Sequence, residues 1–171
     1  IPDYTAALQG EDGQACEDGS CEPETQVEAR TDFAQCARGS GKDCGHLPTI
    51  GASEWLNALG EPHGTVTLVD FWSSSCVNCA REIPEVERIY EKYKDAGLVV
   101  IGVHSPQQAH EREASVVSGA ASRLGITYPV ALDPDLEAFQ AYGATAWPTH
   151  YLAGPDGQLR SVGRGTSGLE E

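Results

Sequence analysis

Two cysteines three positions apart, Cys76 and Cys79, are the residues of this chain whose type and spacing best suit redox chemistry. They stand where an apolar segment with the composition of a strand, 66–72, gives way to a segment with helical spacing. The unpaired N–H groups and the dipole at a helix N-terminus stabilise a thiolate, so Cys76 is predicted to be the attacking nucleophile. Cys79 lies one helical turn later and is predicted to resolve a mixed disulfide formed at Cys76.

Two other interpretations of this pair are a structural disulfide and half of a zinc site. A structural zinc site needs four ligands, and no cysteine follows Cys79, although His104 or His150 could contribute. Single histidines at strand ends are more often structural than catalytic, so we assign no role to either. The position at a strand-to-helix junction favours redox chemistry, and no metal or cofactor is predicted.

Two acidic residues flank the pair in sequence. Asp70 shares a strand face with Val66 and Leu68, where an unpaired buried carboxylate is costly, so it is expected to stay neutral or to find a partner. It is the candidate proton acceptor for Cys79. Glu82 lies three residues after Cys79 on the same side of the helix and could serve the same purpose; the other interpretation is a solvent-exposed helical acid.

A third signal is the segment Trp147-Pro148-Thr149 at the start of an expected strand. An X-Pro bond is permissive for a cis peptide, but only a minority of such bonds are cis, so these residues alone indicate a turn or a strand edge. Pro84 lies inside the helix that follows Cys76 and is expected to kink it, because proline removes a backbone donor.

The elements that must position these residues alternate between strand and helix patterns from His46 onward, which is typical of a layered α/β domain. The nearly continuous apolar run 98–103 predicts a strand buried on both faces at the sheet centre. The other expected strands are 66–72, 130–132, 149–153 and 158–162, and the expected helices are the one from Cys76 to about Gly97, then 107–124 and 135–142.

Length and charge narrow the class of protein. At 171 residues with 40% hydrophobic content, the chain can bury one substantial core. Its 26 acidic residues against 11 basic ones, with no basic run, argue against a nucleic-acid partner. No apolar stretch approaches the ~20 residues that cross a bilayer. Because the sequence starts at Ile1 and has no methionine, we expect a mature or excised fragment from which a targeting or membrane-spanning part was removed.

Residues 1–45 are acidic, rich in Gly and Ser, and without sustained periodicity, so they are predicted to be an irregular extension of a domain at 46–171. The extension carries four cysteines, which allow three pairings; local bridges 16–21 and 36–44 are expected. Their spacing does not match zinc-ligand pairs. Six cysteines in a small acidic chain indicate an oxidising, extracytoplasmic compartment. The four cysteines of the extension are Cys16, Cys21, Cys36 and Cys44.

These motifs together resemble the thioredoxin superfamily over residues 46–165. The resemblance rests on Val69-Asp70-Phe71-Trp72, on Cys76-x-x-Cys79 and on Trp147-Pro148-Thr149. It implies an α/β thioredoxin-like fold, a central mixed sheet flanked by helices, and a cis Pro148 beside the active cysteines. It also implies that Trp72, Trp147 and Thr149 are substrate-binding positions, where the main chain at Trp147 pairs with a substrate strand.

Further features are similar to the extracytoplasmic TlpA/ResA-like branch and to the soluble domain of DipZ-type proteins involved in cytochrome c biogenesis. They include Glu82-Ile83-Pro84 after the cysteines, Glu54-Trp55-Leu56-Asn57, and the segment 97–106. In DipZ-type proteins this domain follows a membrane-embedded part related to CcdA and DsbD. The resemblance therefore implies a protein disulfide reductase that takes electrons from a membrane donor and passes them to protein thiols outside the cytosol.

The chain departs from the thioredoxin family pattern in three ways, and these limit which family properties can be assigned to it. The residues between the cysteines are Val-Asn and not the Gly-Pro of thioredoxin, the extension with four cysteines resembles no motif that we recognise, and the last expected helix is truncated after Glu171.

Two other functions stay open for a chain with this fold. One is a peroxiredoxin-like peroxidase, although Asp70 stands where that motif has proline. The other is a copper(I) metallochaperone, in which Cys76 and Cys79 bind the metal together with a histidine.

Overall fold

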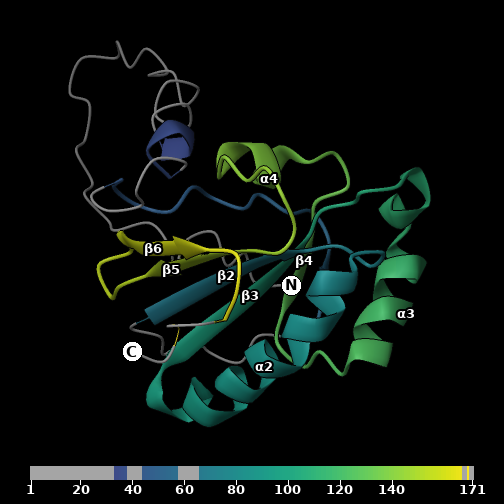
Figure 1. The fold of residues 1–171 in the computed structure, drawn as a ribbon, viewed down its shortest axis with the longest axis horizontal. Coiled ribbons are helices and arrows are strands. Elements are labelled where there is room, and N and C mark those ends of the chain that lie inside the picture. The colour runs from purple at the N-terminus through teal and green to yellow at the C-terminus, as the bar shows by residue number, and fades with distance from the viewer. Residues whose placement is uncertain (1–32, 38–43, 58–65, 167–168, 170–171) are drawn as a thin grey trace, which may run out of the picture.

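A six-stranded sheet forms the centre of the computed structural model, which describes residues 33–37, 44–57, 66–166 and 169. The strand order is β1-β4-β3-β2-β5-β6 (Figure 1). Strands β2, β3 and β4 are parallel, whereas β5, β6 and β1 run antiparallel to their neighbours. The strands are β1 (Trp55–Leu56), β2 (Val66–Trp72), β3 (Leu98–His104), β4 (Val130–Leu132), β5 (Thr149–Ala153) and β6 (Leu159–Gly163).

The central pair β2 and β3 has the residues expected of strands covered on both faces. Each is apolar almost throughout, and the last five residues of each are buried. They pair in register over seven residues, so that Trp72 lies opposite His104 at their carboxyl ends. Ser105 continues this contact by donating its N–H to the Trp72 carbonyl at 3.0 Å. Ligand and catalytic sites of open α/β sheets lie at this edge, and the chain leaves β2 there toward Cys76.

Helices cover both faces of the sheet (Figure 1). The face under α2 and α3 has a largely aliphatic core that includes Leu68, Ile83 and Val100. The opposite face, under α4 and a short helix at 33–37, has an aromatic core that includes Phe71 and Tyr142. The helices are α2 (Val77–Tyr93), η2 (Lys94–Ala96), η3 (Ala109–Arg112), α3 (Ala114–Leu124) and α4 (Glu137–Ala141).

The aromatic core reaches back into the predicted extension. Phe33 is 4% exposed, and its ring packs 5.7 Å from that of Tyr142. Residues 33–37 are helical, where the sequence indicated irregular structure. Next to them Gly143 has φ +69°, and a Cβ there would come within 2.5 Å of the Ala34 carbonyl oxygen. Glycine is needed at this position for both reasons.

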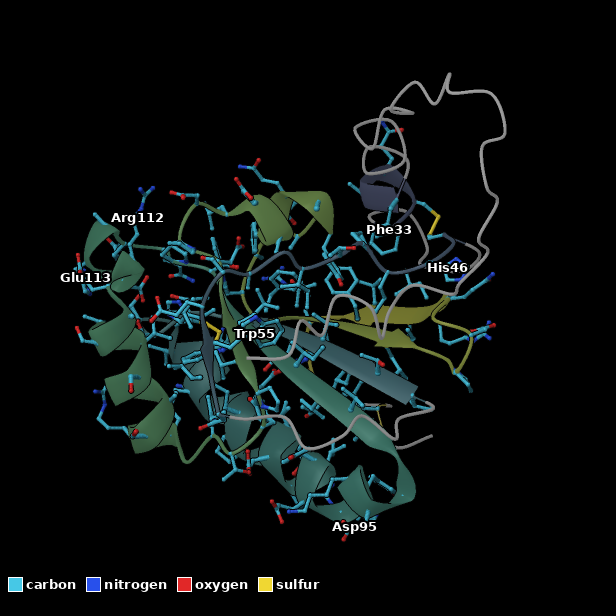
Figure 2. The ribbon with its side chains drawn as sticks, turned by 180° about the vertical axis from the view of Figure 1, so that it is seen from behind. Phe33, His46, Trp55, Asp95, Arg112 and Glu113 are labelled. Carbon is cyan, nitrogen blue, oxygen red and sulfur yellow. A yellow bond between two sulfur atoms is a disulfide. The ribbon has the colours of Figure 1, made fainter. Side chains whose placement is uncertain are left out.

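Two helices differ from those expected. The predicted helix 107–124 is divided into η3 and α3, because Glu113 between them is extended (φ −74°, ψ 122°). Glu113 lies at the outer edge of the molecule (Figure 2). Helix α4 is shorter than the predicted 135–142.

Helix α2 runs as one element through the exposed Pro84. In the described part of the chain, no helix has both the length and the apolar character needed to cross a membrane.

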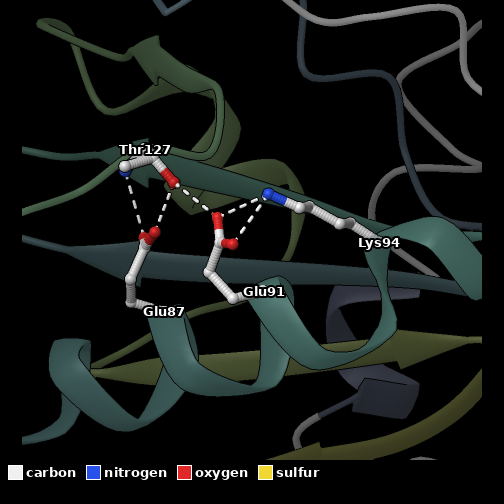
Figure 3. A network of polar contacts seen from close by, with 4 residues as sticks. All are labelled: Glu87, Glu91, Lys94 and Thr127. Atoms are coloured by element: carbon white, nitrogen blue, oxygen red, sulfur yellow. Dashed lines mark hydrogen bonds and ion pairs between the residues drawn. The ribbon is translucent and has the colours of Figure 1, made fainter.

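A surface network connects α2 with the segment that leads into β4 (Figure 3). The Thr127 N–H donates to Glu87 at 3.0 Å, and the Thr127 hydroxyl also donates to Glu87. Lys94 pairs with the neighbouring Glu91 at 2.7 Å. Exposed pairs of this kind add little stability. Because Thr127 directly precedes the buried Tyr128, these hydrogen bonds nevertheless tie α2 to the segment that leads into β4.

Candidate active site

Cys76 and Cys79 form a disulfide at the start of α2, with their Cα atoms 5.2 Å apart. Cys76 is the N-cap residue, and its Sγ accepts the Cys79 N–H at 3.1 Å. The first turn of α2 contains no acidic residue that would repel a thiolate at Cys76. A backbone N–H directed at sulfur and the positive end of a helix both stabilise a thiolate at Cys76.

The two cysteines differ in their exposure to solvent. Cys76 is 8% exposed and Cys79 is 1% exposed, whereas Val77 beside them is 64% exposed. Cys76 is therefore the more accessible of the two cysteines, and a substrate would reach it before Cys79. This difference in exposure matches the order of events in disulfide exchange, in which a mixed disulfide forms and is then resolved.

The loop before Cys76 is held by one buried carboxylate, that of Glu111 in η3. Glu111 is 1% exposed and accepts hydrogen bonds from two segments that are far apart in sequence. The donors, at 2.6–3.1 Å, are the hydroxyls of Ser73 and Ser74 and the N–H groups of Ser75, Gln107 and Gln108. Ser73 in turn accepts the Cys76 N–H at its carbonyl. Glu111 thus fixes the approach of the chain to the active cysteine.

The protonation states of Glu111 and His104 suit this role. Burial acts to raise the pKa of Glu111, but the hydrogen bonds from Ser74, Gln108, Ser73 and Gln107 outweigh it and lower the pKa to about 2. Burial lowers the pKa of His104 to about 4, against the attraction of Glu111. His104 is therefore neutral at pH 7, and its Nε2 accepts the Ser74 N–H at 3.0 Å.

The two predicted acids lie on either side of a histidine. Asp70 and His150 are paired in register across β2 and β5, and each is 1% exposed. Asp70 Oδ1 lies 3.3 Å from His150 Nδ1, and Glu82 Oε2 lies 3.2 Å from His150 Nε2. Burial raises the pKa of Asp70; His150 opposes this rise, Glu82 adds to it, and Tyr128 opposes it.

The Trp147–Pro148 peptide is cis, and this loop lies at the start of β5. Trp147 stacks on Phe139 with ring centroids 4.4 Å apart. The Thr149 hydroxyl donates to the Ala146 carbonyl at 2.6 Å. Thr149 uses its side chain within the loop, so a substrate would meet the main chain here.

One predicted substrate-binding residue, Trp72, has a buried side chain. Trp72 is completely buried and packs edge to face against His104 at 4.8 Å between ring centroids. Its side chain therefore supports the loop before Cys76 from inside, and its assignment as a substrate-binding position stays a prediction. The alternating pattern of β2 is the reason, since Trp72 shares the inner face with Leu68 under α2.

Three functional candidates were not found from the sequence. The sequence assigns no role to His104 or His150, and no motif in it includes Glu111. Each has a partner at least thirty positions away, as in the contacts of His104 with Ser74, of Glu111 with Ser75 and of His150 with Asp70. The only available signal was the placement of both histidines at the ends of apolar strands, where a polar side chain requires a partner.

The extension contributes a second disulfide, Cys36–Cys44, with Cα atoms 5.4 Å apart. It joins the helix at 33–37 to the chain that enters the domain. Cys16 and Cys21 lie outside the described residues. Within the described ranges, no group of three His, Cys, Asp or Glu side chains is arranged to hold a metal ion.

The AhpC/TSA family model matches residues 53–162. The chain belongs to the AhpC/TSA family. It is 38% identical to Protein DipZ of Mycobacterium tuberculosis over 179 residues, which covers 95% of this chain and 25% of that protein. It is 32% identical to thiol-disulfide oxidoreductase YkuV of Bacillus subtilis over 70% of this chain and 83% of that protein. The chain spans a quarter of the length of the curated DipZ proteins it matches.

Solved structures agree with the fold. A thioredoxin-like protein solved in solution in its oxidized form superposes with a TM-score of 0.65 at 29% identity, over 74% of this chain and 88% of that one. The predicted thioredoxin-like fold and the resemblance to DipZ-type and ResA-like proteins are therefore confirmed. Two of the relatives that this chain matches, ResA of Halalkalibacterium halodurans and YkuV of Bacillus subtilis, are named thiol-disulfide oxidoreductases.

Proposed function

We propose that this chain is an extracytoplasmic protein disulfide reductase in which Cys76 attacks, Cys79 resolves and Asp70 accepts the proton of Cys79. The observation that carries the proposal is the placement of Cys76 as the N-cap of α2, with its sulfur accepting a backbone N–H and with more exposure than Cys79. These are the conditions that lower a thiol pKa and present it to a substrate.

The steps follow from this geometry. The Cys76 thiolate attacks a substrate disulfide, and one substrate sulfur leaves and takes up a proton from water. Asp70 then removes the proton from the Cys79 thiol, and the Cys79 sulfur attacks the Cys76 sulfur. The Cys76–Cys79 disulfide forms, the mixed disulfide breaks, and the second substrate sulfur leaves as a thiolate and takes up a proton from water. Asp70 lies on the face of β2 that α2 covers, because it alternates with Leu68 and Trp72.

The cis Pro148 loop is the proposed docking place for an extended substrate segment. Thr149 already uses its hydroxyl on Ala146, and Trp147 is held by Phe139. This leaves main-chain groups at the loop for strand-like pairing with a peptide. The exposed Val77 adds an apolar contact next to Cys76. The substrate class is therefore an extended protein segment that carries a disulfide.

The electron donor and the cellular location are supported by the relationship to DipZ. Almost all of this chain matches a quarter of DipZ, and DipZ-type proteins combine such a domain with a membrane-embedded electron carrier. We propose a donor of the CcdA/DsbD type and an extracytoplasmic setting. In intact cells, a membrane-impermeant maleimide applied after mild reduction should label Cys76. Labelling only after lysis would contradict the location.

The equilibrium potential of Cys76–Cys79 tests the direction of electron flow. A value near that of thioredoxin, about −270 mV, supports a reductant, whereas a value near −120 mV would make the chain an oxidant. The full chain should also reduce insulin disulfides, and Cys76→Ser should abolish this activity.

Two control measurements separate the alternative functions. Rapid oxidation of Cys76 by hydrogen peroxide in stopped-flow mixing would indicate a peroxidase. Stoichiometric copper retained after dialysis, together with no insulin reduction, would indicate a metallochaperone. The proposed function predicts neither result.

A further inference from the structure

His150 is a buried histidine next to the active cysteines' helix, and the reaction steps proposed above give it no role. It lies in β5 directly opposite Asp70 in β2, so both side chains project from the same face of the sheet. That face is covered by α2, which carries Cys79 and, one turn later, Glu82. The imidazole is thus placed between an acid at the centre of the domain and an acid on the active helix.

The contacts of His150 form a continuous path from the interior to the surface. Nδ1 lies 3.3 Å from Asp70 Oδ1, and Nε2 lies 3.2 Å from Glu82 Oε2. The Asp70 and His150 side chains are 1% exposed, and the Glu82 side chain is 27% exposed. Neither Asp70 Oδ1 nor His150 Nδ1 has a hydrogen-bond partner in the described structure, so each is available to the other. Glu82 is the member of this series that reaches water.

Asp70 needs such a path if it is to exchange protons during turnover. Bulk water does not reach a carboxyl that is 1% exposed. The other ionisable group against Asp70 is Tyr128, on the segment before β4, and burial raises the pKa of its phenol well above the usual range. Tyr128 therefore keeps its proton near neutral pH. Imidazole can accept a proton at one nitrogen and release another from its second nitrogen.

We propose that His150 relays protons between Asp70 and Glu82 during disulfide exchange and does not itself contact the substrate. When Cys79 gives its proton to Asp70, Asp70 passes it to His150 Nδ1. His150 releases a proton from Nε2 to Glu82, and Glu82 releases it to water. When a donor dithiol reduces Cys76–Cys79 again, one proton returns to Cys79 along the same path in the opposite direction. The proposal rests on Asp70 being the proton acceptor of Cys79, as proposed above.

Two-phase oxidation by Ellman's reagent separates the steps. The full chain is reduced with one equivalent of dithiothreitol, desalted and mixed with the reagent at 412 nm. The first thionitrobenzoate reports attack by Cys76, and the second reports resolution by Cys79; Cys76→Ser gives the background from other cysteines. In His150→Leu the first phase should stay within twofold of wild type, and the second should slow by at least about tenfold at pH 7. Tyr151→Phe, on the same strand and the opposite face, is the matched control.

The pH dependence distinguishes proton transfer from a structural role. At pH 9, above the ordinary thiol pKa of about 8.5, Cys79 no longer depends on proton transfer to Asp70 during the resolving step, so the second phase of His150→Leu should return toward the wild-type rate. Glu82→Gln should slow the second phase in the same way, and the double variant should be no slower than His150→Leu, because both changes interrupt one path. If His150→Leu fails to fold by circular dichroism, His150→Gln keeps a polar side chain without the ability to relay a proton.

Different outcomes overturn different proposals. If Asp70→Asn resolves at the wild-type rate, Asp70 is not the acceptor and both proposals fail. If Asp70→Asn is slow but His150→Leu and His150→Gln resolve normally, the role of Asp70 stands and the relay through His150 is wrong. An equal slowing of His150→Leu at pH 7 and pH 9 would also overturn the relay.

Discussion

Replacing Glu111 by glutamine should loosen the loop that carries Cys76 and destabilise the domain by about 3 kcal/mol. The folded pKa of about 2, against an ordinary value of 4.5, corresponds to this energy, since one pKa unit is worth about 1.4 kcal/mol. The contacts give a similar value. Glutamine turns one acceptor oxygen into an NH2 group, which faces at least two donors, and each hydrogen bond to a charged group contributes about 1.5–3 kcal/mol.

Urea unfolding followed by tryptophan fluorescence measures this loss, and Glu113→Gln is the matched control. Glu113 is two residues away, exposed at the outer edge, and its side chain makes no cap hydrogen bond to α3 (Figure 2). Its substitution should change the free energy of unfolding by less than about 0.5 kcal/mol. The alkylation rate of Cys76 at pH 7 should also fall in Glu111→Gln, because the loop before the cysteine is no longer held.

The pH dependence gives a second check on Glu111. A carboxylate with a lowered folded pKa contributes stability that is complete above its unfolded pKa of 4.5 and is lost as the pH falls toward 2. The difference between wild type and Glu111→Gln should therefore shrink over this range. A loss below about 1 kcal/mol at pH 7, or a difference that does not depend on pH, would refute the assignment of Glu111 as the clamp.

Three further changes have expected outcomes that follow from burial and backbone geometry. The pKa of His104 falls from 6.5 to about 4 on folding, so wild type should lose about 3 kcal/mol of stability as the pH falls through that range; urea titrations should show a weaker loss in His104→Gln. Burial raises the pKa of Asp70, so ionisation opposes folding as the pH rises above 3.8, and Asp70→Asn should raise the melting temperature at pH 7 but not at pH 3. Gly143→Ala should destabilise the domain more than Gly125→Ala, because both glycines have positive φ but only at Gly143 would the new Cβ meet the Ala34 backbone. Equal losses in the two alanine variants would contradict that contact.

The sequence predicted the central strands well because strands that are buried on both faces consist of continuous apolar residues, which can be recognised locally. Continuous apolar runs at 66–72 and 98–103 correspond to β2 and β3 with at most one residue of difference. The two-residue strand β1 has no such pattern, and it exists only because Trp55 and Leu56 pair with β4. The break at Glu113 likewise follows from bonds that Glu111 makes to the distant serine loop and to Gln107 and Gln108.

For the site, the sequence by itself predicted the cysteine pair and its order of reaction, because helix position and three-residue spacing are local properties. It also indicated a buried Asp70, since a carboxyl within an apolar strand must be desolvated. Only the tertiary structure decided which partners those residues have. Strand pairing brings His150 to Asp70, and the fold of η3 brings Glu111 to the loop before Cys76. A buried polar group requires a partner, but the chain does not encode that partner at any fixed spacing, so only the packed sheet could identify it.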